Sequence, residues 1–438
     1  MATSEYAQVL ASLYALEAAK GMDFKLERVA LALRKLGDPH RQFAAVHIAG
    51  TNGKGSVAAM LHAMFAAQGY RVGLYTSPHL VSFTERIRVG AEEISEDTVV
   101  SLAREVRGAA TVHGIELTFF EFVTVMAFLH FARAQVALAI IETGLGGRLD
   151  ATNVIVPEVA VITCIGVDHQ EYLGTTLQSV AREKAGIIKA NCPVIVGAVP
   201  TEARHVLDEV ATSCTAPVRW LGRDFAIAGD CVLRFDSAGA VLDDLQLALR
   251  GMHQRDNAAV AIATAVQLRA RFPLSDAAIR RGLATVQWPG RLEIVETAPL
   301  VVLDGAHNVD GIAMLTRELP TLIEGKTLHL LFAVMRDKQW EPMIAMLGPV
   351  VATATVTATG QRRGEDPRAL ARHFERYCPT RVIIEPRAAL TTVLQQTASN
   401  DAIVVTGSLF LVGAIYPFFL DQRGTQRLFS SAIATLHP

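Results

Sequence analysis

Residues 44 to 68 have the pattern of a strand, a glycine-rich loop and a helix. The apolar run 44–48 leads into Ala49-Gly50-Thr51-Asn52-Gly53-Lys54-Gly55-Ser56, and a helix-like segment follows over 57–68. In such a loop the glycines let backbone N–H groups turn toward an anion, and the helix N-terminus adds partial positive charge. Lys54 can reach terminal phosphates and Ser56 can offer a hydroxyl to Mg²⁺. The segment therefore predicts a phosphate cradle and ATP chemistry.

The match to the usual phosphate-loop pattern is imperfect. That pattern, G-x-x-x-x-G-K-[ST], requires glycine where Ile48 stands and Ser or Thr where Gly55 stands. Gly55 is thus an extra glycine between Lys54 and Ser56. The alternative interpretation is a glycine-rich turn with a solvated lysine, and the strand–loop–helix context favours the phosphate loop over it.

Length and composition limit the class of protein. A chain of 438 residues exceeds what one hydrophobic core usually supports, so two domains are expected. Apolar residues make up 51%, charged residues 19%, and the formal net charge is −2. These values argue against disorder and against a basic field for nucleic acid, so small-molecule partners are expected.

The sequence gives little indication of a membrane span, a signal peptide or a cysteine-based metal site. The longest apolar segment, 407–420, is shorter than a bilayer span and contains Pro417. The N-terminal residues carry Glu5 and Glu17 and lack the form of a signal peptide. We therefore expect a cytoplasmic protein with no membrane partner. Five scattered cysteines without C-x-x-C spacing argue against a disulfide framework or a zinc site.

Short β-branched runs alternate with longer helical patterns, which is typical of an α/β fold with mainly parallel sheets. The expected strands include 136–142, 159–165, 194–197, 300–304, 328–335 and 402–407. Proline and glycine at 288–291 mark a boundary, after which a new strand–helix alternation begins. We expect an ATP-binding phosphate-loop domain over residues 1–295 and a Rossmann-like α/β domain over residues 296–438.

Polar residues follow several of these strands at the edge where open α/β sheets bind ligands. Glu142 ends one strand and suits a divalent cation that bridges phosphates, although it could equally cap a helix or pair with Arg148. Ser77 lies in a second strand-end segment. Because Mg²⁺ prefers oxygen ligands, residue chemistry alone favours His169 as a polar loop residue and not as a metal ligand. By itself, Lys184 is interpreted as a solvated helix lysine.

Taken together, the motifs closely resemble the folylpolyglutamate synthase/dihydrofolate synthase family. They are, in chain order, G-T-N-G-K-G-S, T-S-P-H-L, F-x-E-R-I, E-x-G-L-G-G-R-L-D-A-T-N, D-H, E-K-A-G-I, W-P-G-R-L-E, L-D-G-A-H-N and T-G-S-L-F-L-V-G. The phosphate loop with the extra glycine is the form that this family uses. The resemblance extends over nearly the whole chain.

The resemblance implies an ATP-dependent ligase of the wider Mur-ligase type that joins a carboxylate to the amino group of L-glutamate. ATP would phosphorylate the carboxylate, and the amine would attack the acyl phosphate and expel phosphate. The chemistry is sound, because a carboxylate is a poor electrophile until phosphorylation supplies a leaving group. The expected substrates are ATP, glutamate, and dihydropteroate or a reduced folate, with Mg²⁺ as the metal.

The family's site residues map onto matching positions in this chain. Lys54 is expected to neutralise charge on the transferring phosphoryl group, and Lys184 matches a position that is carbamylated in the family. Catalytic roles are implied for Lys54, His169 and Lys184, and nucleotide would lie between the two domains. The nucleotide contacts are expected from Thr51, Asn52, Gly53, Lys54, Gly55, Ser56, Asn257, Arg291, Asp304 and His307. The metal ligands are expected from Ser56, Ser77, Glu142, His169 and Lys184.

The pterin-bearing substrate is expected at two segments, because aromatic rings stack on a flat pterin and an acid accepts its hydrogen bonds. These residues are Thr118, Phe119, Phe120, Glu121, Leu149, Asp150 and Ala151. Core packing is the alternative for the two phenylalanines. The glycines at 144–147 are expected to let the loop that carries Asp150 close over the ligand.

Three alternatives stay open from sequence. The enzyme could be a folylpolyglutamate synthase without the dihydrofolate synthase activity. A peptidoglycan Mur ligase fits less well, because fewer than fifty residues precede Gly50 and we expect no separate nucleotide-sugar domain there. A nucleotide-hydrolysing switch belongs to another class. We expect a monomer, and the sequence leaves open whether a monovalent cation is required.

Overall fold

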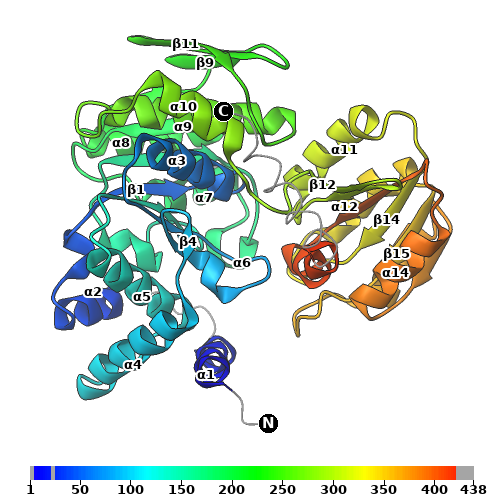
Figure 1. Ribbon diagram of the computed structural model, residues 1–438, viewed down its shortest axis with the longest axis horizontal. Helices are drawn as coiled ribbons and strands as arrows, with labels where there is room; N and C mark the ends of the chain where they lie inside the picture. The colour runs from blue at the N-terminus through cyan, green and yellow to red at the C-terminus, as the bar shows by residue number, and fades with distance from the viewer. Residues whose placement is uncertain (1–3, 21–24, 421–438) are drawn as a thin grey trace, which may run out of the picture. The chain divides into compact units, whose positions relative to one another are not determined.

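The computed structural model describes residues 4–20 and 25–420, which form two compact units (Figure 1). Unit 1 holds the described residues up to 248 and residues 253–288, and unit 2 holds residues 249–252 and the described residues from 289. The division falls ahead of the expected boundary at residue 295. The reason is that β12 (Glu293–Thr297) pairs with β13 (Leu300–Leu303) and so belongs to unit 2.

Unit 1 is built on an eight-stranded sheet with the order β4-β3-β2-β5-β1-β6-β7-β8. Neighbouring strands run parallel from β2 to β8, and the β4-β3-β2 edge is antiparallel. The strands are β1 (Ala44–Ala49), β2 (Val72–Tyr75), β3 (Ile87–Val89), β4 (Glu92–Glu93), β5 (Leu138–Glu142), β6 (Val159–Cys164), β7 (Val194–Ala198) and β8 (Val218–Trp220). Every residue of β5 is buried, as expected for a parallel strand covered on both faces.

Helices surround this sheet (Figure 1). They are α1 (Glu5–Lys20), α2 (Leu26–Lys35), α3 (Lys54–Gln68), α4 (Glu96–Val112), α5 (Phe119–Arg133), α6 (Gln170–Leu173), α7 (Leu177–Ala185), α8 (Thr201–Ser213), α9 (Met252–Leu268) and α10 (Asp276–Thr285), with short 3-10 turns η1 (Pro39–Arg41), η2 (Phe83–Arg86) and η3 (Ala151–Val154). A small antiparallel sheet, β9 (Phe225–Ala228), β10 (Leu233–Ser237) and β11 (Ala240–Leu245), lies beside α10 (Figure 1).

Unit 2 has a six-stranded sheet with the order β12-β13-β17-β14-β15-β16, parallel except for the β12–β13 pair. Its further strands are β14 (Leu328–Phe332), β15 (Thr353–Val356), β16 (Thr380–Val382) and β17 (Ala402–Thr406). Its helices are α11 (Val309–Ile323), α12 (Trp340–Leu347), α13 (Pro367–Phe374) and α14 (Pro386–Gln396), with the 3-10 turn η4 (Gly348–Val350) and a helical segment from residue 409 to 420.

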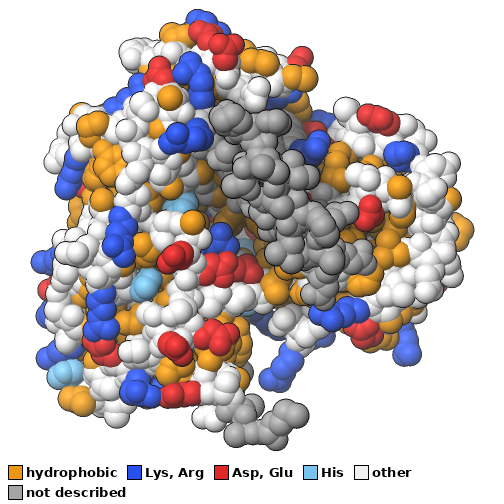
Figure 2. All heavy atoms as spheres, in the orientation of Figure 1, with side chains coloured by type: hydrophobic (Ala, Val, Ile, Leu, Met, Phe, Trp, Pro, Cys, Tyr) orange, Lys and Arg blue, Asp and Glu red, His pale blue; other side chains and the backbone are white. Residues whose placement is uncertain are grey.

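The expected two-domain α/β class with mainly parallel sheets is confirmed. All six expected strands form, each within a few residues of the predicted ends. The helix after the phosphate loop begins at Lys54, earlier than the expected start at residue 57. Within residues 4–20 and 25–420, no helix is both long and apolar enough to span a bilayer. Figure 2 shows basic and acidic side chains interspersed over the visible face.

The helix that carries the phosphate loop is fixed by close backbone packing. A β-carbon added at Gly282 of α10 would lie 2.6 Å from the Met64 Cα and backbone N of α3. Real β-carbons do not come that near to backbone atoms. The contact therefore requires glycine at residue 282, and it places α10 directly against α3.

We predict that Gly282→Ala lowers the free energy of unfolding by about 1–3 kcal/mol, because the added methyl must push two helices apart. Gly108→Ala is the matched control, since it is also a helical glycine but has no atom within 4 Å of an added β-carbon. The control should gain about 0.5–1 kcal/mol. Urea denaturation followed by circular dichroism measures both, and equal stability of the two variants would contradict the packing.

Candidate active site

The phosphate loop lies between β1 and α3, and its lysine folds back on the loop itself. Gly53 precedes the helix with a left-handed φ of 83°. The Lys54 Nζ donates to the carbonyl oxygens of Gly50 at 3.0 Å and Thr51 at 3.3 Å. Ser56 is buried in the first turn of α3. The lysine and the serine hydroxyl are therefore both located on the loop and the first helical turn, as a phosphate cradle requires.

The two glycines around Lys54 make room for side chains from distant parts of unit 1. A β-carbon at Gly55 would lie 2.7 Å from Cζ2 of Trp288, and one at Gly53 would overlap the Asn257 amide. Gly55, the departure from the usual pattern, is thus required by the Trp288 indole. Asn257, a predicted nucleotide contact, lies directly against the loop. In the sequence, Trp288 belongs to a boundary segment and to the W-P-G-R-L-E motif, and neither of these predicts its contact with the loop.

Lys184 of α7 is buried and points at the same loop, which corrects the view of it as a solvated helix lysine. Its side chain is 4% exposed, and its Nζ donates to the Gly50 carbonyl at 2.8 Å. Burial, and after it the nearby Lys54, lower the pKa of Lys184 to about 7, although Cys164, Asp168 and Asp150 act in the opposite direction. The uncharged form of this amine is therefore much easier to reach near neutral pH than it is for an exposed lysine.

Two of the predicted metal ligands meet at the carboxyl edge of the sheet. Glu142 ends β5 and is 5% exposed, and its Oε2 accepts from the Ser77 backbone N–H at 3.2 Å. Strands β2 and β5 are parallel neighbours, so the residues that follow them lie at the same edge. Among the described residues, no group of three or more His, Cys, Asp and Glu side chains gathers in a way that could hold a metal ion.

His169 lies on the loop after β6, in a left-handed conformation with φ of 51°. Asp168 Oδ1 accepts from the His169 backbone N–H at 2.8 Å, and the His169 Nε2 is 4.0 Å from Asp168 Oδ2. A left-handed backbone conformation is uncommon for a residue other than glycine, and His169 adopts it close to the predicted metal site. Because β6 is the parallel neighbour of β1, this loop and the phosphate loop follow strands at the same edge.

The glycine-rich loop after Glu142 docks tightly on α7. A β-carbon at Gly147 would lie 2.9 Å from the carbonyl oxygens of Glu183 and Lys184. The Arg148 backbone N–H donates to the Glu183 carbonyl at 2.7 Å, and Asn153 Nδ2 donates to the carbonyls of Arg148 and Gly186. We expected these glycines to let the loop move, and in the structure Gly147 instead lets the loop pack closely against α7. This docking joins the motif of Glu142 to the motif of Lys184.

Asp150 is buried at the end of this loop, where its carboxylate holds the backbone. It accepts from the Leu145 N–H at 2.8 Å, from the Thr152 N–H at 3.0 Å and from the Thr152 hydroxyl. Burial raises the pKa of Asp150, and these hydrogen bonds oppose the rise. The neighbours Leu149 and Ala151 are half-buried and buried. In this conformation Asp150 caps η3 and fixes the loop.

The segment from Thr118 to Glu121 forms the start of α5 through a capping box. The Glu121 carboxylate accepts from the Thr118 backbone N–H at 2.7 Å and from Arg28 at 2.8 Å, so its oxygens already have partners. Phe119 stacks on Tyr14, with a centroid distance of 5.6 Å. These three predicted substrate residues therefore have structural contacts of their own.

Phe120 has a different position. Its ring stacks on Tyr75 at a centroid distance of 5.9 Å, and it occupies the space that a β-carbon at Gly144 would need. Phe120 thus lies beside the loop that Asp150 fixes. Of the two phenylalanines, it is the one that the structure brings next to the second predicted substrate segment.

In unit 2, the predicted nucleotide residues also lie close together. The Asp304 carboxylate accepts from the backbone N–H groups of Leu292 and Ala306, both at 2.9 Å. A β-carbon at Gly305 would lie 3.1 Å from the Arg291 Nη1. His307 Nδ1 is 2.8 Å from the Gly305 carbonyl. Asp304 therefore ties the loop after β13, which carries His307, to the segment before β12 that carries Arg291.

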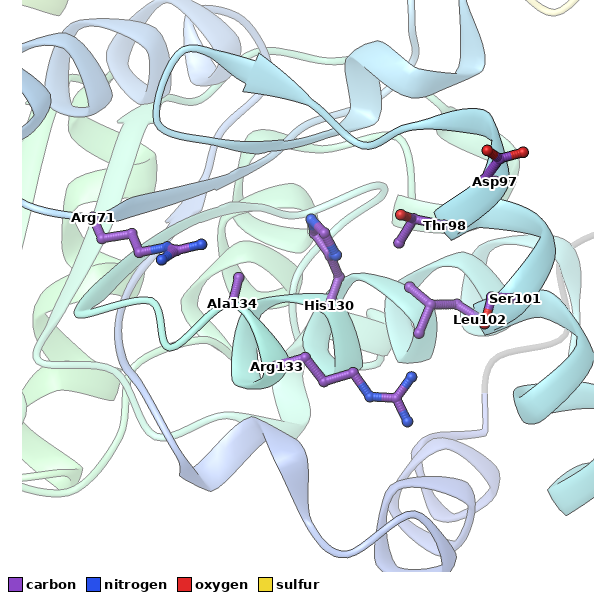
Figure 3. Close-up of a pocket in the computed structure, with 8 residues that line it drawn as sticks. All are labelled: Arg71, Asp97, Thr98, Ser101, Leu102, His130, Arg133 and Ala134. Atoms are coloured by element: carbon purple, nitrogen blue, oxygen red, sulfur yellow. The ribbon is translucent and has the colours of Figure 1, made fainter.

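A surface hollow of about 440 Å³ lies elsewhere in unit 1. Its lining includes Arg71, which precedes β2, His130 and Arg133 near the end of α5, and residues of the first two turns of α4 (Figure 3). Since Arg71 stands at the amino end of its strand, the hollow lies at the sheet edge opposite the phosphate loop. It contains none of the predicted site residues.

Comparison with known proteins gives a consistent result. The chain matches the Mur ligase middle domain over residues 48–265 and the Mur ligase glutamate ligase domain over residues 290–409. Dihydrofolate synthase/folylpolyglutamate synthase of Bacillus subtilis (strain 168) is 35% identical over 410 residues, covering 89% of this chain and 94% of that protein. Its counterpart from Mycobacterium tuberculosis (strain ATCC 25618 / H37Rv) is 36% identical over 440 residues, covering 91% and 90%.

Solved structures agree in fold. E. coli FolC in complex with DHPP and ADP matches with a TM-score of 0.88 at 33% identity, covering 96% of this chain and 100% of that chain. Mycobacterium tuberculosis folylpolyglutamate synthase complexed with ADP matches with a TM-score of 0.89 at 35% identity, covering 95% and 99%. The chain therefore belongs to the dihydrofolate synthase/folylpolyglutamate synthase family of the Mur ligases.

Proposed function

We propose that this chain is an ATP-dependent ligase that joins L-glutamate to dihydropteroate, giving dihydrofolate, and to reduced folates, giving their polyglutamates. The observation that carries the proposal is the pair of lysines, Lys54 and Lys184, that meet on the Gly50 carbonyl of a phosphate loop. A lysine on the phosphate loop suits a reaction in which negative phosphate charge moves and grows, and the amine of Lys184 beside it is available for modification. Family membership over nearly the whole chain supplies the substrate class.

In the reaction, a carboxylate oxygen of the folate substrate attacks the γ-phosphorus of ATP, and ADP leaves. The glutamate amine then attacks the carbonyl carbon of the acyl phosphate. The tetrahedral intermediate expels phosphate and the amine loses its proton, which leaves the amide. Lys54 stabilises the charge on the transferring phosphoryl group, and the loop N–H groups orient it. The steps require no nucleophilic Ser or Cys.

We assign the metal ligands to Ser56, Ser77, Glu142 and His169 and, as a carbamate, to Lys184. The geometry that supports this is the Glu142 carboxylate beside Ser77 at one sheet edge, since oxygen donors suit Mg²⁺. When bound, the cation would neutralise charge on the nucleotide phosphates. A structure related to this chain, bifunctional folylpolyglutamate synthase/dihydrofolate synthase, contains Mn, AMPPNP and L-glutamate. Whether a monovalent cation is also required is tested by replacing potassium with sodium in the assay.

We assign nucleotide contacts to the loop residues 51–56 and to Asn257, Arg291, Asp304 and His307, and folate contacts to Phe120, Leu149, Asp150 and Ala151. Thr118, Phe119 and Glu121 are assigned a supporting role in the folate site, because their side chains hold the start of α5. The proposal includes a monomer in the cytoplasm, and light scattering tests the monomer.

The central experiment is an ADP-release assay with glutamate, in which dihydropteroate and tetrahydrofolate are offered separately. Activity with both supports a bifunctional enzyme, and activity with tetrahydrofolate alone would show a folylpolyglutamate synthase only. ATP turnover without glutamate would instead favour a nucleotide-hydrolysing switch. Ligation of a peptidoglycan precursor would favour a Mur-type amino-acid ligase.

Lys54→Ala should lower kcat by about a hundredfold or more, because the phosphoryl group loses its nearest positive charge. Lys35→Ala is the control, since Lys35 is exposed at the end of α2. Both variants should keep the wild-type melting temperature. Near-normal amide formation by folded Lys54→Ala would exclude the phosphate-loop assignment.

We propose that Lys184 is carbamylated. Its uncharged amine can add CO₂ and release a proton, and the resulting anion would lie near the Lys54 ammonium. With isotopically labelled bicarbonate, carbon NMR should show a carbamate signal in the wild type and none in Lys184→Arg, whose guanidinium stays protonated. Activity should fall when bicarbonate is removed and return when it is restored. Identical spectra for both proteins would refute the modification.

Asp150→Ala should raise the KM for dihydropteroate about tenfold and leave the KM for ATP within about twofold, because the lost hydrogen bonds release the loop beside Phe120. Asp150→Asn keeps part of the hydrogen bonding, so its KM for dihydropteroate should lie between the values of the wild type and Asp150→Ala. Asp97→Ala, in the hollow on the opposite sheet edge, serves as the control. An unchanged KM for dihydropteroate in Asp150→Ala would contradict this role.

A further inference from the structure

The middle of the phosphate loop is held by the last two residues of the neighbouring strand β6. The Asn52 backbone N–H donates to the Cys164 Sγ at 3.2 Å. The Asn52 carbonyl accepts from the Thr163 hydroxyl at 2.6 Å and from the Cys164 thiol at 3.3 Å. Both backbone polar groups of Asn52 therefore bond to side chains that belong to no predicted site.

The same segment contacts the loop on both sides of Asn52. The Thr51 N–H donates to the Cys164 carbonyl at 2.9 Å. The Thr51 hydroxyl donates to the Gly166 carbonyl at 2.8 Å and accepts from the Gly166 N–H at 2.9 Å. Thr163 is buried, and its hydroxyl fills the space that a β-carbon at Gly50 would need. Residues 163–166 thus follow the loop from Gly50 to Asn52.

The hydrogen bonds to the Asn52 carbonyl fix the position of the loop and also the direction of the next backbone N–H group. The carbonyl of Asn52 and the N–H of Gly53 belong to one planar peptide unit, and in a trans peptide they point in opposite directions. Holding the carbonyl against Thr163 therefore aims the Gly53 N–H away from β6. A phosphate loop binds its anion through such N–H groups, so a peptide that could rotate would bind more weakly.

We propose that Thr163 and Cys164 are positioning residues for the nucleotide: they hold the Asn52 peptide so that the loop N–H groups are aimed at the phosphates before ATP arrives. This inference rests on the proposed function, because it takes the loop to be the ATP site. Neither side chain is a catalytic residue, since both act through the backbone of Asn52.

Two pairs of variants separate the hydrogen bonds from packing. Thr163→Val keeps the branched shape and removes the hydroxyl, whereas Thr163→Ser keeps the hydroxyl. Cys164→Ala removes the thiol, whereas Cys164→Ser keeps a donor and acceptor at that position. Cys231→Ser is the control, because Cys231 is an exposed cysteine of the small antiparallel sheet region. For each protein, calorimetry gives the ADP dissociation constant, and steady-state kinetics give kcat and the KM values for ATP and glutamate.

Thr163→Val and Cys164→Ala should weaken ADP binding and raise the KM for ATP about tenfold, the scale of a lost buried hydrogen bond. The KM for glutamate should stay within about twofold, and both serine variants should recover most of the ADP affinity. Equal ADP affinity in the valine and serine variants of Thr163 would overturn the inference. A rise in the KM for glutamate as large as the rise in the KM for ATP would also overturn the inference. If Thr163→Val does not fold, the Cys164 pair decides the matter by the same criteria.

The two proposals can fail separately. A wild-type protein that binds ADP but performs no glutamate-dependent ATP turnover would refute the proposed function, and the ADP affinities of the variants would still decide the positioning role. A wild-type protein with full ligase activity and variants of unchanged ADP affinity would refute the positioning role alone. A wild-type protein that binds no ADP would refute both.

Discussion

The carbonyl oxygen of Gly50 accepts hydrogen bonds from two lysine side chains, and the arrangement of the site depends on this point. Lys54 comes from the loop itself, and Lys184 comes from a helix far along the chain. Two amines on one oxygen repel each other when both are charged, and burial adds to the cost of charging Lys184. The site thus places the loop lysine next to a buried amine whose pKa is lowered to about 7.

Close backbone packing at glycines brings these groups together. Gly147 allows the loop after Glu142 to lie on the carbonyls of α7, and this fixes the helix that carries Lys184. Gly53 and Gly55 admit Asn257 and Trp288 against the phosphate loop, and Gly282 admits α10 against α3. A side chain at any of these positions must move a neighbour. The short glycine-containing motifs therefore act as contact points between elements more than as sources of mobility.

Much of the fold around the phosphate loop, and part of the candidate site, could be predicted from local sequence patterns. The apolar run before Gly50 and the glycines after it predict a strand, a loop and a helix, because each rule depends on near neighbours in sequence. Polar residues at the ends of parallel strands predict the edge where Glu142 and Ser77 meet. The T-x-x-E spacing from Thr118 to Glu121 is a capping-box signal, which indicates a structural role for Glu121 that the substrate hypothesis overlooked.

Other features depend on tertiary contacts and have no local signal. Lys184 sits among charged residues in α7, so only the docked loop reveals its burial. The contact of Trp288 with Gly55 and the hydrogen bonds of Thr163 and Cys164 to Asn52 join residues that are remote in sequence. A threonine and a cysteine at the end of a strand are otherwise unremarkable.

In the proposed reaction, ATP activates the substrate carboxylate as an acyl phosphate. The most direct test is a single reaction with dihydropteroate whose carboxylate carries a heavy oxygen isotope, followed by mass spectrometry of the released phosphate. One carboxylate oxygen should appear in the phosphate for each amide formed, because that oxygen bridges carbon and phosphorus in the intermediate. Phosphate free of the heavy isotope, released together with the amide product, would contradict it.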